Sequence, residues 1–308
     1  MFWALLAGIG VCTNAAYFIA NKIFLQRLSP CQLAAAGFLS TALILTPFVL
    51  ATGIPVIGPA FFLAALATTV LNILGTAITF RSLSSSDISL AIPMLSFTPL
   101  FLVGTASLLL GESPSAAGAA GIVIIVTGSY ILNTAAEHES IADPFRAMVS
   151  HPGVLGMLGV AFLYSISINF DKIVVQNSDP LFASASVTLM LGVSFAVLAI
   201  LEHAGLLPGL MHPVQEHSGS IGPCRSPASW FYLIGAGLVG GTLIAVEAVA
   251  INSAYLIQIA PYVIAIKRMS IILVVLYGTL IFHERELVRR ITGAGLMVTR
   301  AVLILVFP

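Results

Sequence analysis

The stretch from Ser85 to Leu132 limits the fold more than any other part of the chain, because its only charged residues are Asp87 and Glu112. Two apolar segments flank a short polar turn at residues 111–114. At a rise of 1.5 Å per residue, about 20 apolar residues cross the roughly 30 Å of hydrocarbon in a bilayer. The turn is too short to do more than reverse the chain, so we predict a transmembrane helical hairpin.

Composition extends this assignment to the whole chain. Hydrophobic residues make up 59% of the 308 residues, charged residues make up 8%, and the mean hydropathy is +1.08. Soluble domains contain about 45–50% apolar and about 25% charged residues, so this chain belongs to the membrane class. The formal net charge of zero gives no reason to expect a nucleic-acid partner.

Apolar runs of helical length predict an all-α integral membrane protein with about ten transmembrane helices. The predicted spans are Trp3 to Phe24, Leu33 to Leu50, Ala60 to Phe80, Ile88 to Leu110, Ala116 to Leu132, Gly153 to Val175, Phe182 to Leu201, Trp230 to Tyr255, Ala260 to Phe282 and Ile291 to Phe307. An odd number of spans in each half predicts two inverted five-helix repeats. We assign residues 1–135 to the first repeat, 136–152 to a linker loop and 153–308 to the second repeat.

Two internal matches support the division into halves. The same three residue types occur at the same spacing in both halves, as Glu112, Gly121 and Thr127 and again as Glu284, Gly293 and Thr299. The motif Lys-Ile-x-x-Gln-x-x-x-Pro occurs at residues 22–30 and again at residues 172–180. Both matches keep the same order along the chain, which favours a duplicated unit over coincidence.

Ionisable residues inside predicted spans are the first candidates for function, because a charge in hydrocarbon is costly unless it is paired or faces water. Glu247 lies deep in the eighth span, and Lys267 and Arg268 lie in the ninth. One interpretation is a purely structural ion pair. The other is that Glu247 takes up a proton or binds a substrate ammonium group, with the two cations as its movable counter-charge.

Other polar residues in the spans are weaker candidates for a substrate site between the first, third, fourth, sixth, eighth and ninth spans. Lys22 and Lys172 lie near helix ends, where lysine commonly reaches the headgroups, but their repetition also suits a cavity with two mouths. Pro93, Pro99 and Pro261 are predicted to interrupt helices and free backbone carbonyl groups. The remaining candidates are Asn14, Tyr17, Asn72, Ser96, Tyr164, Asn169 and Tyr262.

Two further features are interpreted as structural. Glu112 and Glu284 are expected to hold short turns at the membrane surface and to favour the start of the helix that follows each of them. The spacing Gly237-x-x-x-Gly241 indicates close helix packing, with a homodimer contact as the weaker alternative.

Enzyme motifs are missing from the sequence. His283-Glu284 begins like a zinc-protease motif, but Leu287 stands where the second histidine ligand belongs. No phosphate-binding loop, nucleophile–base pair or metal-ligand spacing accompanies it. We therefore expect a protein that is not an enzyme and that needs no cofactor or metal.

The hairpin SSSDISLAIPMLSFTPLFLVGTASLLLGE with its following glycines, the lysine before Ser29-Pro30, and the two halves together resemble the EamA-type transporters of the drug/metabolite transporter superfamily. The resemblance covers essentially the whole chain. His283 replaces the glycine of the family's Gly-Glu turn in the second copy, and Gly37 stands near the place of an arginine that the family often has. The family usually has cytoplasmic termini, whereas the basic residues in the loops favour the opposite orientation.

This resemblance implies a secondary active transporter or exporter of small metabolites that works by alternating access. The expected partners are a small-molecule substrate, a coupling proton or ion, and the lipid bilayer. The expected location is a cell membrane, with the bacterial plasma membrane favoured by the short loops. The alternative is a membrane scaffold or assembly factor that keeps the fold without transport. A water-filled cavity that joins Glu247, Lys267 and the polar residues near the prolines (Ser89, Ser96, Thr98, Tyr262 and Ser270) would favour the transporter, and a dry, fully packed interior would favour the scaffold.

Overall fold

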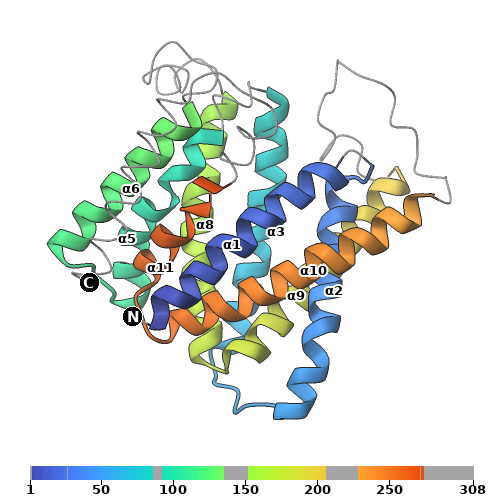
Figure 1. The fold of residues 1–308 in the computed structure, drawn as a ribbon, viewed down its shortest axis with the longest axis horizontal. Coiled ribbons are helices and arrows are strands. Elements are labelled where there is room, and N and C mark those ends of the chain that lie inside the picture. Colours follow the sequence, from blue (N-terminus) through green and yellow to red (C-terminus); the bar gives the residue numbers. More distant parts are fainter. Residues whose placement is uncertain are drawn as a thin grey trace.

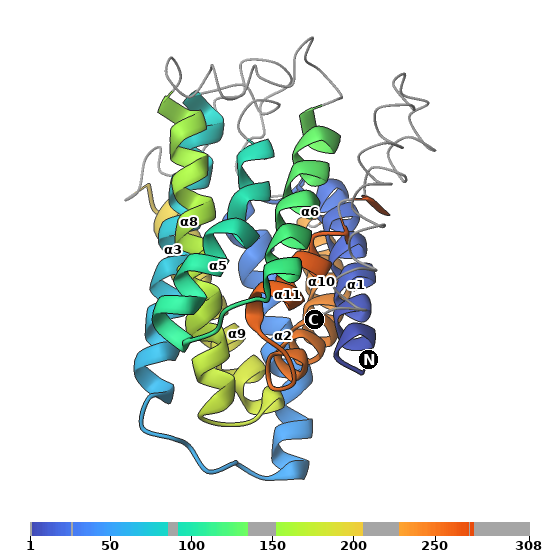
Figure 2. The ribbon, with the colours of Figure 1, turned by 90° about the vertical axis from the view of Figure 1, so that its left-hand side faces the viewer.

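The structure is a computed structural model that describes residues 2–25, 27–85, 92–134, 152–205, 228–270 and 272–273. In these ranges every regular element is a helix: α1 (Phe2–Phe24), α2 (Pro30–Thr52), α3 (Phe61–Ser85), the 3₁₀ helix η1 (Ile92–Phe97), α5 (Thr98–Leu110), α6 (Ala116–Thr134), α8 (Pro152–Gln176), α9 (Pro180–His203), α10 (Ala228–Tyr255) and α11 (Ala260–Lys267). Figures 1 and 2 show the long helices packed side by side as a bundle. The all-helical fold class is thus confirmed.

Length and exposure of the helices support a multi-pass membrane protein. Among the described residues, six helices are long and apolar enough to cross a membrane, at Phe2–Asn21, Pro30–Thr52, Phe61–Thr79, Pro152–Gln176, Pro180–His203 and Phe231–Tyr255. Large apolar side chains face outward from them, including Leu43 (74% exposed), Leu63 (72%) and Phe231 (83%). Such a surface suits lipid better than water. The layout of ten spans in two repeats stays a prediction, because residues 274–308, with Glu284, Gly293, Thr299 and the tenth span, lie outside the described residues.

The repeated motif begins a helix in both of its copies. Ser29 caps α2, since its hydroxyl accepts a hydrogen bond from the Gln32 amide (3.3 Å) while the Gln32 side chain accepts one from the Ser29 amide (3.1 Å). Asp179 caps α9 by accepting bonds from the amides of Leu181 (2.8 Å) and Phe182 (2.9 Å). In both copies a proline follows the cap in the first turn. Each copy of the motif therefore closes one long helix and opens the next.

Two prolines have a different role from the predicted one. Pro99 and Pro261 do not interrupt helices; they lie in the first turns of α5 and α11. Proline is well tolerated there, because the first amides of a helix have no partner within the helix. The segment before Pro99 is the 3₁₀ helix η1, so the predicted fourth span is divided into two elements.

Small residues bring α10 against α2. Thr41 of α2 donates a hydrogen bond to the carbonyl of Gly241 (3.0 Å). A Cβ placed on Gly241 would lie 2.6 Å from the Cβ of Ser40, and one on Gly237 would lie 2.6 Å from the Ser40 hydroxyl. Glycine is thus required for this approach of the two backbones. Close helix packing through Gly237 and Gly241 is confirmed, and it occurs within the chain.

An interaction between sequence-distant elements holds one end of the bundle. Glu112, in the turn after α5, forms an ion pair with Lys172 near the end of α8. The other oxygen of Glu112 accepts a hydrogen bond from the Ala260 amide at the start of α11 (2.9 Å), and Lys172 donates to the Gln258 carbonyl (2.7 Å). The carboxylate therefore caps α11 rather than the helix that follows it, which corrects one prediction. The α5–α6 turn, α8 and the α10–α11 turn are joined at this point.

Removing the charge of Glu112 should destabilise the protein strongly. In Glu112→Gln, Lys172 keeps its buried charge without its carboxylate partner, and breaking one side of such a pair typically costs about 3–5 kcal/mol. The thermal unfolding midpoint in detergent should fall well below that of wild type. The double variant Glu112→Gln/Lys172→Met should recover part of the loss; an equal or larger loss in the double variant would contradict a charge-based role.

Adding a methyl group at Gly241 should also destabilise the protein. Gly241→Ala forces α2 and α10 apart, and overpacking of this kind costs about 1–3 kcal/mol. Gly104→Ala in α5 is the matched control, because a Cβ there meets nothing within 4 Å. The control should be neutral or should gain about 0.5–1 kcal/mol in helix propensity. The measurement is the unfolding midpoint of the two variants, and an equal shift in both would refute the packing argument.

Candidate substrate cavity

A cavity of about 380 Å³ lies among the helices. This volume is within the range of small-molecule binding sites. Its lining comes from α1, α2, α3, α8, α9, α10 and α11, with Arg268 and Ser270 directly after α11. Five of the six spans predicted to line a substrate site, the first, third, sixth, eighth and ninth, line this cavity. The described residues of the sixth predicted span, the fourth, contribute none, whereas the second and seventh spans, which the prediction omitted, supply Phe38 and a row of residues on α9.

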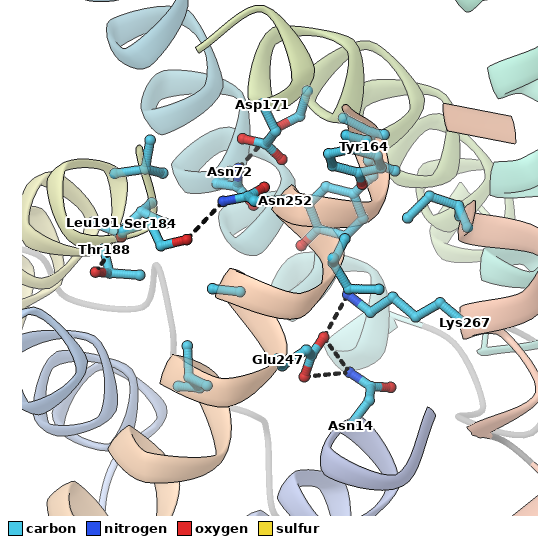
Figure 3. Close-up of a pocket in the computed structure, with 18 of the residues that line it drawn as sticks. Asn14, Asn72, Tyr164, Asp171, Ser184, Thr188, Leu191, Glu247, Asn252 and Lys267 are labelled. Carbon is cyan, nitrogen blue, oxygen red and sulfur yellow. Dashed lines mark hydrogen bonds and ion pairs between the residues drawn. The ribbon is translucent and has the colours of Figure 1, made fainter. Parts of the chain in front are cut away.

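Seven of the predicted residues meet at this cavity: Asn14, Tyr17, Asn72, Tyr164, Glu247, Lys267 and Arg268. They come from five different elements and from both ends of the sequence. Figure 3 shows Glu247 between Lys267 and Asn14, while Asp171 and Asn72 lie together elsewhere on the wall. Glu247, Lys267 and Ser270 therefore converge on one cavity, whereas Ser96, Thr98 and Tyr262 do not line it and Ser89 lies outside the described residues, so the arrangement expected of a transporter is met only in part.

Glu247 of α10 is held by residues of two other elements, α1 and α11. Its carboxylate pairs with the Lys267 ammonium (2.5 Å) and accepts two hydrogen bonds from the Asn14 amide (3.1 and 3.2 Å). The Asn14 oxygen in turn accepts a bond from the Ser270 hydroxyl (2.8 Å). Glu247 is 9% exposed, so its charge is compensated mainly by these neighbours and not by bulk water. A positively charged substrate group could replace Lys267 without leaving the carboxylate unpaired.

A second polar group surrounds Asp171 on α8. The Thr68 hydroxyl donates a hydrogen bond to Asp171 (2.6 Å) and lies 2.7 Å from the Ser167 hydroxyl. Asn72 donates to Ser167 (2.8 Å). Because a hydroxyl has a single proton, Thr68 gives its own to Asp171 and accepts that of Ser167. The result is a directed chain from Asn72 through Ser167 and Thr68 to the carboxylate.

Asp171 was not among the residues singled out from the sequence, where it adjoins the oppositely charged Lys172 near a predicted helix end. Successive residues on a helix point about 100° apart. Asp171 therefore lines the cavity while Lys172 turns to Glu112. Ser184 and Asn252, joined by a 2.8 Å hydrogen bond, are further lining residues that no sequence signal distinguished from ordinary interhelical contacts.

The other predicted site residues lie elsewhere. Lys172 is in the ion pair with Glu112, and Ser96 is buried in η1 without lining the cavity. Asn169 is buried between α8 and α5, where it donates to the Thr105 hydroxyl (2.9 Å). Tyr262 accepts a hydrogen bond from the Ser115 amide (3.0 Å) before α6. The side chain of Lys22 lies outside the described residues.

The described residues contain no group of three His, Cys, Asp or Glu side chains placed to hold a metal ion. The residues that line the cavity offer ion pairing, hydrogen bonding and contact with aromatic rings. Phe18 and Phe38 add apolar surface to the tyrosines. Such a lining suits binding of a small polar molecule that carries an apolar part.

Comparison with known proteins agrees with this architecture. Residues 1–134 match the model of the EamA-like transporter family. No curated protein matches the chain. A solved structure described only as "Crystal structure of protein" superposes with a TM-score of 0.70 over 99% of this chain and 97% of its own, at 15% sequence identity. At that identity the likeness shows a shared fold.

The cavity should admit water-soluble reagents. A cysteine in place of Asn252 lines it, whereas a cysteine in place of Thr41 lies in the buried α2–α10 contact. In a background with Cys12, Cys31 and Cys224 replaced by serine, Asn252→Cys should react with a small hydrophilic thiol reagent several times faster than Thr41→Cys. Mass spectrometry of the labelled protein gives both rates. Equal, slow labelling would indicate a dry interior.

Proposed function

We propose that this protein is a secondary active transporter or exporter of small metabolites that works by alternating access, and the match of residues 1–134 to the EamA-like transporter family model supports this proposal. Members of this family are transporters rather than enzymes. The match to the family is consistent with the drug/metabolite transporter superfamily. The observation that supports the proposal most directly is the cavity with the Glu247–Lys267 ion pair in its wall. We place the protein in a bacterial plasma membrane.

The ion pair is the proposed recognition element for a charged substrate group. A substrate ammonium group would bind Glu247 in place of Lys267, and a substrate carboxylate would bind Lys267 in place of Glu247. In either case one buried ionic contact replaces another, so neither charge is left unpaired. A cavity of about 380 Å³ limits the substrate to a small metabolite.

Arg268 adds a second cation to the same wall. Within the described part of the chain it makes no ion pair, although Tyr164 lies close enough to interact with it electrostatically. A guanidinium group binds carboxylate or phosphate in a planar, two-point arrangement. Arg268 is therefore the proposed contact for an anionic group of the substrate.

Neutralising Glu247 should abolish most transport. The test is uptake and efflux by proteoliposomes offered a mixture of labelled amino acids, nucleosides and small organic cations, with and without a pH gradient. Glu247→Gln should lower the initial rate by about tenfold or more, equivalent to at least about 1.4 kcal/mol of lost stabilisation. The loss follows because the amide can no longer hold Lys267 or a substrate cation.

Two further variants make this test specific. Glu202→Gln is the matched control, because Glu202 lies in the last turn of α9 and does not line the cavity. It should transport as wild type does. Glu247→Gln/Lys267→Met should restore the unfolding midpoint without restoring transport, which separates binding from stability. Full transport by a well-expressed Glu247→Gln protein would contradict the proposed site, and no flux in wild type would favour the scaffold alternative.

A further inference from the structure

We propose that Asp171 is the group that takes up and releases a coupling proton, whereas Glu247 serves the substrate. This inference rests on the proposed transport function. It assigns the two carboxylates of one cavity to two different tasks, and the assignment follows from their different partners.

The first step is the contrast between the two carboxylates. Glu247 has a lysine at 2.5 Å and two hydrogen bonds from Asn14, so its negative charge is balanced at short range. Asp171 has no ion pair in the described part of the chain, and the neutral Thr68 hydroxyl donates a hydrogen bond to it (2.6 Å). An enclosed carboxylate without a cation is the one that a proton neutralises most readily.

The second step is access. Asp171 lines the cavity, so whichever side the cavity opens to can supply or accept the proton. Lys172, the next residue, is turned away into the ion pair with Glu112. Protonation of Asp171 therefore does not require the Glu112 interaction to break, and one end of the bundle stays joined while the cavity changes charge.

The third step is the set of groups around Asp171. Three of the helices around the cavity, α2, α3 and α9, bring no titratable side chain to its wall. Their lining residues are Phe38, Asn72, Ala183, Ser184, Val187, Thr188 and Leu191. The titratable groups that share the cavity are Tyr17 from α1, Tyr164 from α8, Glu247 and Tyr255 from α10, and Lys267 and Arg268 from α11 and the residues after it. Lys267 is the cation whose charge acts on Asp171, but its ammonium group is bound to Glu247.

The fourth step is charge balance. The net charge of the four ionisable side chains Asp171, Glu247, Lys267 and Arg268 is zero when all four are ionised. When a hydronium ion gives its proton to Asp171, one O–H bond forms, one water molecule is released, and the cavity gains one positive charge. A cationic substrate then binds better once the proton has left, and an anionic substrate binds better once it has arrived. A cationic substrate would therefore be transported in exchange for a proton (antiport), and an anionic substrate would be transported together with a proton (symport).

The experiment compares accumulation with exchange in the same proteoliposomes, using the labelled mixture of amino acids, nucleosides and small organic cations. For each protein, the readout is the ratio of accumulation driven by a pH gradient to exchange without a gradient. In Asp171→Asn the accumulation under a pH gradient should fall to the level that wild type reaches without a gradient, while exchange continues, so the ratio falls. Asp179→Asn is the matched control, since asparagine also caps a helix and residue 179 lies outside the cavity.

The outcomes separate this inference from the proposed function. Wild type that exchanges nothing counts against the transport function itself. Wild type that exchanges, together with an Asp171→Asn protein that still accumulates on a pH gradient, overturns only the role of Asp171. Accumulation by wild type that follows a Na⁺ gradient and ignores pH also overturns it.

A second variant keeps the test open if Asp171→Asn fails to fold. Thr68→Val removes the hydroxyl that donates to Asp171. Because that hydrogen bond stabilises the ionised carboxylate, its loss should make the proton leave at higher pH. The pH at half-maximal exchange should shift upward relative to wild type. An unchanged pH profile would show that Asp171 does not set it.

Discussion

A charge inside this bundle needs a partner close at hand, because hydrocarbon supplies no water to stabilise it. Two lysine–glutamate pairs meet this requirement in different surroundings. Lys172 and Glu112 are enclosed, and they also bind the backbone at Gln258 and Ala260. Lys267 and Glu247 border a cavity. The enclosed pair therefore only joins helices, whereas the pair at the cavity can also bind a solute. What distinguishes the two pairs is whether solvent or a solute can reach them.

Much of the fold could be predicted from the sequence because apolar runs and helix caps are local signals. The spans beginning at Trp3, Phe182 and Trp230 each lie within a helix of the structure. Prolines were harder, since a proline that interrupts a helix and one that begins a helix look alike in an apolar run. Pro99 and Pro261 are of the second kind. What distinguishes them is the path of the preceding residues, which tertiary packing decides.

The candidate site was only partly predictable. Glu247 and Lys267 were found because a charge in an apolar span is conspicuous on its own. Lys172 was also conspicuous, but its partner Glu112 lies 60 positions away in a turn, and nothing local indicates that pairing. Asp171 was overlooked because its neighbour carries the opposite charge, although the helix turns the two apart. Neutral residues such as Ser184 and Asn252 carry no signal that separates a cavity wall from a helix contact.

The close approach of α2 and α10 has a mechanical consequence. At Gly237 and Gly241 the backbone of α10 lies directly against Ser40 of α2, and Thr41 donates a hydrogen bond to the Gly241 carbonyl. Such a contact cannot slide gradually, because close-packed surfaces have no intermediate arrangement of low energy. We therefore expect α2 and α10 to move together as one unit in any conformational change of the bundle.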